Sequence, residues 1–324
     1  MGLWQLRLSL LGTLAMIIGL STLFFTAVLF FVFQTVDLAV LGVFVVGFNI
    51  VQWLISPYLI GLMYRAKEVS SSEKPKLHEI VERLSAKSDL KKPKVMVANI
   101  PIPNAFAYSS PIAGSRVAVT SELLNTLNGN EVEAVIGHEL GHLKHRDVGV
   151  MMFVSILPAL FYYLSYSTLF SSMYGSRDDR GSSGGAAAIG AVSLVMYFVL
   201  TLFTLHLSRI REYFADRHSA SIVDGGANKL STGLIKIVNY TSRTRQNRRN
   251  TGGGIGSFKA LFISDPDRAS AERAAISQSI GYQNGQNMVN EMIRKDVTTW
   301  DKVAELLSTH PNIVKRLRAL QELD

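Results

Sequence analysis

Two histidines and a glutamate lie close together in the sequence His-Glu-Leu-Gly-His at residues 138–142, within a stretch that we expect to be helical from Glu131 to about Asp147. Residues four apart lie on the same face of a helix, one turn above each other. His138 and His142 can therefore aim two imidazole nitrogens at one metal ion, roughly 2 Å from each nitrogen. Glu139 lies one step round the helix, where its carboxylate can take a proton from a water at the metal. The pattern is typical of zinc hydrolases, although two solvated histidines and a surface glutamate are the simpler alternative.

A second pair of residues four apart, Glu212 and Asp216, ends the sequence Ser-Arg-Ile-Arg-Glu-Tyr-Phe-Ala-Asp at residues 208–216. A zinc ion held by two histidines needs a third protein ligand and an open position for water. Glu212 is our candidate for that ligand, with Asp216 one turn further on to hold a ligand imidazole by its other nitrogen. By itself this spacing is more often a solvated charged face, but its place after a metal-type helix favours the metal site. A histidine ten residues after His138, the other common third ligand, is absent because that position is Val148.

The composition limits the kind of protein and the kind of metal site. The chain has 324 residues without a cysteine, so a zinc ion must be held by histidines and carboxylates. Apolar residues make up 48% and the mean hydropathy is +0.22, which is high for a soluble protein. The formal charge of +8 could suggest nucleic acid. The excess lies beside long apolar runs, however, and no nucleic-acid motif occurs, so a lipid bilayer is the better explanation.

Four long apolar stretches predict four transmembrane helices. They are residues 8–33, 38–63, 148–173 and 186–208, which contain no charged residue apart from the titratable His206. Each exceeds the roughly 20 residues needed to cross a bilayer. The first is too long for a signal peptide and lacks a convincing cleavage site, so we interpret it as an anchor. Buried core helices of a soluble protein are the alternative.

The flanking charges predict the orientation of these helices in the cell membrane. Lysine and arginine residues concentrate on the cytoplasmic side of membrane helices. The connection at residues 34–37 carries no such residue, and in the connection at 174–185 two arginines are balanced by two aspartates. We therefore expect both termini and the metal motif on the cytoplasmic side. The basic flanking residues are Arg7, Arg65, Lys67, Lys74, Lys76, Lys144, Arg146, Arg209, Arg211 and Arg217.

The polar part of the chain should contain a small sheet. Residues 94–98 and 116–120 are rich in valine and are predicted strands. Between them, residues 100–108 contain two prolines, which exclude a central strand and favour an edge strand or a loop beside one. An exposed edge can bind an extended peptide as an additional strand, whereas an ordinary apolar loop fits the pattern equally well. Before them, within residues 70–94, Leu77, Ile80, Val81 and Leu84 recur at the spacing of an amphipathic helix.

Other local patterns predict caps, breaks and loops. Asn130 with Glu133 resembles a capping box that would begin the metal helix, and this helix should run almost without a break into the apolar stretch at Val148. Another amphipathic helix is expected at residues 229–239. Four arginines at 243–249 and a glycine-rich tract at 251–257 favour a mobile basic loop near anionic lipid, or a solvated loop without a partner. His310 is either a solvated loop residue or a donor to a developing oxyanion.

Four short pieces of the sequence, taken together, resemble the HtpX-type membrane zinc metalloproteases, relatives of the CaaX prenyl proteases. The pieces are residues 104–107 (Asn-Ala-Phe-Ala), 138–142, 208–216 and 309–311 (Thr-His-Pro), in the family's order. The zinc motif alone is shared by many unrelated proteases, but the four pieces with four apolar stretches are specific and cover essentially the whole chain. The arginine-rich and glycine-rich segments have no counterpart in this pattern.

The resemblance implies one zinc ion per chain and quality control of damaged or misfolded membrane proteins. The implied roles are zinc ligands for His138, His142 and Glu212, general base for Glu139, support of a ligand for Asp216, proximity to the oxyanion for His310, and substrate binding for Asn104, Ala105, Phe106 and Ala107. The expected fold is a mainly α membrane protein with four transmembrane helices and a cytoplasmic α+β zincin-like (gluzincin) domain with a small sheet. The expected parts are a transmembrane hairpin at 1–66, protease segments at 67–147 and 209–324, and a second hairpin at 148–208.

Three other functions deserve comparison with a membrane endopeptidase that cleaves polypeptides. A prenyl-protein protease is disfavoured because four apolar stretches are fewer than a larger bundle needs. An intramembrane protease is disfavoured because Lys144, His145 and Arg146 place the motif outside the hydrocarbon. A non-catalytic adaptor held together by zinc would usually have a fourth protein ligand, and it would not need Glu139.

Overall fold

The computed structural model describes residues 38–174, 183–249 and 285–323. The first predicted transmembrane stretch (8–33), the connection after it (34–37), most of the second connection and the glycine-rich tract (251–257) lie outside these residues. The chain forms two compact units, one from Met1–Trp53 and Gly149–Leu207 and the other from Leu54–Val148 and Ser208–Asp324.

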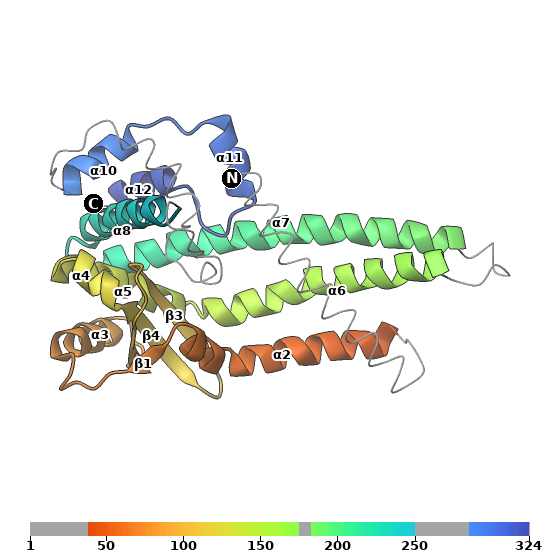
Figure 1. Ribbon diagram of the computed structural model, residues 1–324, viewed down its shortest axis with the longest axis horizontal. Helices are drawn as coiled ribbons and strands as arrows, with labels where there is room; N and C mark the ends of the chain where they lie inside the picture. The colour runs from red at the N-terminus through yellow and green to blue at the C-terminus, as the bar shows by residue number, and fades with distance from the viewer. Residues whose placement is uncertain (1–37, 175–182, 250–284, 324) are drawn as a thin grey trace. The chain divides into compact units, whose positions relative to one another are not determined.

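Three long apolar helices occupy the second, third and fourth predicted membrane stretches (Figure 1). They are α2 (Leu38–Met63), α6 (Asp147–Tyr174) and α7 (Ser183–Ile222), and each is long and apolar enough to cross a membrane. Large apolar side chains on them are exposed, for example Val43 (72%) and Phe203 (65%). Exposed apolar surface of this extent is typical of contact with lipid, so the chain is a membrane protein.

The sheet has four strands and mixed direction. In the order β1-β2-β4-β3, the outer pairs are antiparallel and the central pair β2–β4 is parallel. The strand predicted at 94–98 is confirmed to the residue, and the apolar piece at 100–108 leads into an edge strand. The bounds are β1 (Ala66–Glu68), β2 (Lys94–Ala98), β3 (Ala105–Ser110) and β4 (Gly114–Thr120).

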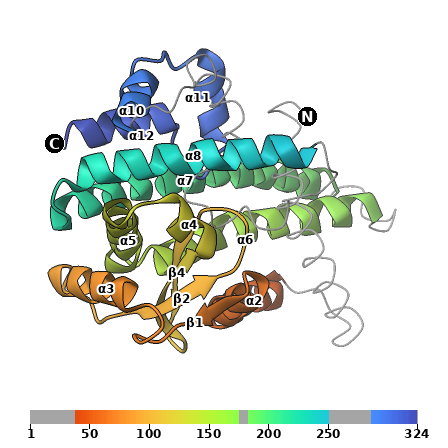
Figure 2. The ribbon, with the colours of Figure 1, turned by 60° about the vertical axis from the view of Figure 1, so that its left-hand side comes forward.

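Helix α5 (Gly129–Lys144) is the centre of the second unit (Figure 2). It packs against the sheet through β3 and β4, and against α3 (Pro75–Lys87) and α8 (Gly226–Arg249). Leu84, Leu140 and Leu234 are fully buried in the shared core, where each such side chain stabilises the fold by about 1.5–3 kcal/mol. The shorter helices are α4 (Ser121–Thr126), α10 (Gly285–Ile293), α11 (Thr299–Leu306) and α12 (Ile313–Gln321).

The start of α5 differs from the prediction by two residues. Asn128 is the N-cap: its side chain accepts from the Glu131 amide at 3.0 Å, and its own amide donates to the Glu131 carboxylate at 3.0 Å. Glu133, predicted to complete the box with Asn130, instead pairs with Arg83 at 2.9 Å. The buried Glu131 also pairs with Lys236 of α8 at 2.7 Å, so a tertiary contact selects this register.

The metal helix was predicted to run almost without a break into the third apolar stretch, and the structure has a break of two residues there, His145 and Arg146. Helix α5 ends at Lys144, His145 is its C-cap, and Arg146 has a φ of 54° before α6 begins at Asp147. A left-handed residue other than glycine costs roughly 1–3 kcal/mol, so contacts beyond the turn must offset it. The turn brings the Asp147 carboxylate back toward His142, at 2.6 Å.

The basic stretch at 243–249 is helical and not a loop as predicted, because α8 continues to Arg249. Arginine and glutamine favour helix, and here they extend the amphipathic helix that the sequence indicated at 229–239.

Candidate active site

Helices α5 and α7 approach closely at a glycine of the metal motif. A Cβ added to Gly141 would lie 2.9 Å from the Cα of Ala215, and one added to Gly137 would lie 3.0 Å from the Ser219 hydroxyl. The absence of a side chain at Gly141 lets the backbones meet, as at other tight helix crossings. Glu212, one turn before Ala215 on α7, is thereby brought opposite the histidines of α5.

The structure places three ligand-type side chains around one point, which is a group compatible with a metal ion. The Nε2 atoms of His138 and His142 are 3.1 Å apart, and the Glu212 oxygens lie 3.7 Å from the first and 3.5 Å from the second. Metal–ligand bonds of about 2.0–2.1 Å in a tetrahedron separate ligand atoms by roughly 3.4 Å. The three distances bracket that value, so the arrangement fits a zinc-sized cation.

A carboxylate contacts the Nδ1 atom of each histidine, the ring nitrogen that does not face the metal point. His138 Nδ1 lies 2.9 Å from Asp216 Oδ1, and His142 Nδ1 lies 2.6 Å from Asp147 Oδ2. A proton on Nδ1 that is shared with a carboxylate leaves the Nε2 lone pair directed at the metal point. The four-residue spacing in the sequence indicates Asp216 but not Asp147. Its position five residues after His142 becomes meaningful only once the helix breaks between them.

Each of these carboxylates is paired in turn with an arginine. The Arg316 guanidinium donates two bonds of 2.6 Å to Asp216 and lies 3.1 Å from Glu212 Oε2. Arg211 pairs with Asp147. Burial alone would lower the pKa of Arg316, but Asp216 and Glu212 raise it above its ordinary range. Arg316 therefore stays charged, whereas burial lowers the pKa of Arg211. The sequence indicated no role for Arg316, and it indicated Arg211 only as a basic flanking residue.

The net charge of the side chains at the site is negative, which favours a bound cation. Four carboxylates face two guanidinium groups, so a divalent cation at the histidine pair would balance the sum. Glu212 Oε2 is buried and ion-paired with Arg316, but it accepts no hydrogen bond from the described residues, so a metal ion could bind it as a further partner. The four acids are Glu139, Asp147, Glu212 and Asp216.

Glu139 lies against the edge strand of the sheet. It is 3% exposed, and its carboxylate accepts a hydrogen bond from the Ala107 backbone amide of β3. Burial raises the pKa of Glu139, while His138 and His142 act in the opposite direction. The candidate general base is therefore shielded from solvent and oriented by the strand.

The residues predicted for substrate binding do not all face the site. Asn104 is buried, and its backbone amide donates to Thr120 Oγ1 at 2.9 Å. The Phe106 ring packs against the Tyr64 ring, with 4.9 Å between the ring centroids. Ala105 is buried in the core with the sheet. Of the four, Ala107 contacts the candidate active site, through Glu139.

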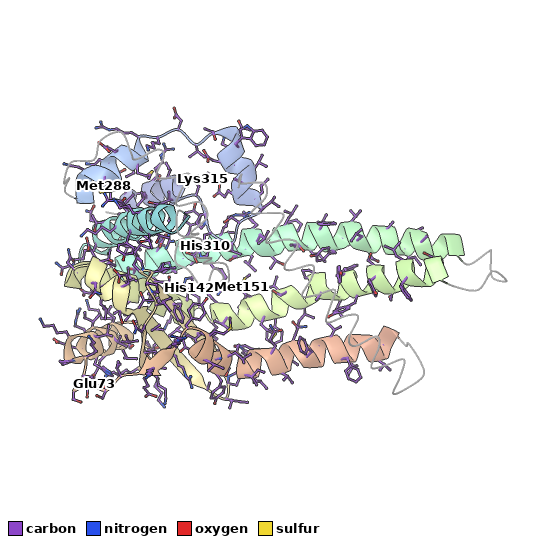
Figure 3. The ribbon with its side chains drawn as sticks, viewed as in Figure 1. Glu73, His142, Met151, Met288, His310 and Lys315 are labelled. Carbon is purple, nitrogen blue, oxygen red and sulfur yellow. The ribbon has the colours of Figure 1, made fainter. Side chains whose placement is uncertain are left out.

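His310 lies beside the metal group, and Figure 3 labels it together with His142. Its Nε2 is 3.8 Å from Glu212 Oε1 and its Nδ1 is 3.0 Å from the Thr309 hydroxyl. Its side chain is 17% exposed, so it faces the site and keeps some contact with solvent.

The sequence of this chain is similar to that of a known family of proteases and to several of its members. The sequence model of peptidase family M48 matches residues 71–324 of this chain. A "Protease HtpX homolog" of Thermoplasma acidophilum is 34% identical over 343 residues, covering 100% of this chain and 99% of that protein. The homologue of Aeropyrum pernix is 38% identical over 277 residues, covering 85% of this chain and 82% of that protein.

A solved structure has the same fold. The crystal structure of S. mikatae Ste24p aligns with a TM-score of 0.59 and 18% identity, covering 98% of this chain and 66% of that one. The predicted resemblance to HtpX-type proteases is confirmed by the relatives, and the mainly helical membrane fold with a small sheet is confirmed by the structural likeness.

Replacing Gly141 by alanine should separate α5 from α7, because the new Cβ would meet backbone. We expect weaker zinc binding and a lower thermal unfolding temperature in detergent, measured on purified protein. Gly129→Ala is the control: a Cβ there has no neighbour within 4 Å. A Gly141→Ala protein with undiminished zinc affinity and stability would contradict the importance of this contact.

Replacing Asp147 by asparagine keeps its shape but removes the charge that orients His142. Loss of such a partner typically weakens metal binding by about 10–100-fold, which a zinc titration against a competing chelator would measure. Asp89→Asn is the control, since that carboxylate is fully exposed. Equal affinities of the two variants would show that Asp147 does not orient the ligand.

Proposed function

The chain belongs to peptidase family M48 and is a metalloprotease, and on this premise we propose that it is a zinc endopeptidase that cleaves damaged or misfolded membrane proteins at the cytoplasmic face of the membrane. The observation that carries the proposal is the placing of His138, His142 and Glu212 around one point, with Glu139 beside them against an edge strand. The protease domain is of the zincin (gluzincin) type, and the full chain has four transmembrane helices.

In this proposal His138, His142 and Glu212 hold one zinc ion. Zinc supplies Lewis acidity toward a water and toward the scissile carbonyl. Glu139 receives the proton of the attacking water on its carboxylate and returns it to the leaving amine. The Ala107 amide keeps the carboxylate of Glu139 oriented, and burial strengthens each of these electrostatic interactions. His310 donates from Nε2 to the developing oxyanion.

The edge strand supports an extended polypeptide as the substrate. β3 pairs with β4 on one side, and on its other side the amide of Ala107 points to Glu139. A substrate added along this edge would form main-chain hydrogen bonds, which depend little on sequence. Such binding favours segments that are already unfolded, which is the property shared by damaged and misfolded proteins.

The continuity of α7 supports a site near the membrane surface. Glu212 follows the last residue of the apolar stretch, Ser208, by four residues in an unbroken helix, which is roughly 6 Å of rise. The basic residues at this end of the stretch support the cytoplasmic side. At that height the site suits membrane-protein segments at the surface better than freely diffusing peptides.

Glu139→Gln keeps the shape of the side chain and removes the base. We expect zinc to stay bound and the turnover of an unfolded model polypeptide in detergent to fall by at least about 10²-fold. Glu79→Gln, on the exposed side of α3, is the control. Glu212→Ala should instead lose zinc, measured by metal analysis. Undiminished turnover in Glu139→Gln would refute the mechanism.

The absence of cysteine allows a direct test of orientation. His145→Cys lies in the exposed turn after the metal helix, and we expect a membrane-impermeant thiol reagent to label it only from the cytoplasmic side. Asp178→Cys, in the connection predicted to lie outside, should show the opposite labelling. Labelling of position 145 from outside would reverse the proposed topology.

A further inference from the structure

Arg209 is a buried arginine of α7 that lies outside the metal group. It is 6% exposed, and its Nη1 is placed to donate to three backbone carbonyls, those of Glu305 at 2.7 Å, Leu306 at 3.2 Å and Ser308 at 2.7 Å. A guanidinium withdrawn from water must be compensated by acceptors, and these carbonyls provide them. One nitrogen of Arg209 thus binds three backbone carbonyls of the segment 305–308.

The three carbonyls lie where α11 ends and a short connection to α12 begins. The last carbonyls of a helix lack partners within the helix, and a cation there is favourable. The far end of the connection is tied as well, because the Glu305 carboxylate accepts from the Asn312 amide at 3.2 Å. The connection is therefore held at both ends, with the Arg209 side chain inside its first bend.

This connection carries His310. The Ser308 carbonyl bonds to Arg209, the Ser308 hydroxyl accepts from the His310 amide at 3.2 Å, and His310 Nε2 reaches to 3.8 Å from Glu212. Arg209 precedes Glu212 by three residues, so both side chains lie on the same face of α7. One helix face therefore bears the proposed ligand and fixes the segment that brings His310 opposite to it.

We propose that Arg209 is a positioning residue for His310: its guanidinium sets the path of residues 305–310 and thereby the distance between the imidazole and the metal group. The proposal rests on the role proposed above for His310 as a donor to the oxyanion. Lysine is a poor substitute, because a single ammonium on a shorter stem cannot match the reach of the planar guanidinium.

The test uses the full-length chain in detergent and compares Arg209→Met with the matched control Arg217→Met, an exposed arginine of the same helix. His310→Ala should lower kcat by about 10²–10³-fold, the usual cost of one oxyanion donor. Arg209→Met should lower kcat by about tenfold or more, but by no more than His310→Ala does. Its KM and zinc content should be unchanged. Arg209→Lys should recover part of the loss.

Two further measurements separate positioning from general stability. In the His310→Ala background, Arg209→Met should lower kcat no further, because the group on which it acts is already absent. Hydrogen exchange should become faster at residues 305–312 and stay unchanged in α5. If Arg209→Met does not fold, the same comparisons are made with Arg209→Lys.

The outcomes distinguish this proposal from the proposed function. An equal loss of kcat in both backgrounds, or unchanged exchange at 305–312, overturns the role of Arg209 and leaves the protease mechanism intact. A His310→Ala protein with normal kcat overturns both the oxyanion donor and Arg209 as its positioning residue. Normal turnover in Glu139→Gln overturns the mechanism itself.

Discussion

The close contact between α5 and α7 at Gly141 is the constraint on which the site depends. The two histidines come from one helix and Glu212 from the other, and the three ligand atoms lie within 4.8 Å only because the backbones meet. A tetrahedral metal site tolerates errors of a few tenths of an ångström, so the interhelical distance cannot vary freely. Packing that is usually regarded as structural here determines whether the chemistry is possible.

The same contact forces a set of charges into a buried place, and their pairing follows from that cost. An unpaired buried carboxylate is strongly destabilising, whereas a carboxylate with an arginine on one side and an imidazole on the other is satisfied. The arrangement occurs twice, as His138–Asp216–Arg316 and His142–Asp147–Arg211. The acids thereby fix the two rings, and the arginines fix the acids, so the ring orientations are set before a metal binds.

Spacing along the sequence was sufficient to predict the parts of the site that lie on regular helices, and insufficient where tertiary contacts decide. His138, His142, Glu212 and Asp216 follow from pairs four apart, and β2 from its valines. Asn128 with Glu131 and Asn130 with Glu133 have the same spacing, so only the burial of Glu131 against Lys236 distinguishes them. The left-handed turn at Arg146 has no glycine to indicate it, and Asp147 was missed for that reason. Arg316 is separated from its partner by 100 residues, a distance at which spacing carries no information.

The edge strand shows how a motif can act through its backbone. Asn104 is buried just before the strand and the Phe106 ring packs against Tyr64, while the Ala107 amide is the group that reaches Glu139. A substrate aligned on this edge would therefore meet main-chain atoms first, and the small side chain of Ala107 leaves room for them. Recognition of this kind reads the extended backbone common to all polypeptides. On the proposed function, selectivity would then come from whether a segment is unfolded and near the site.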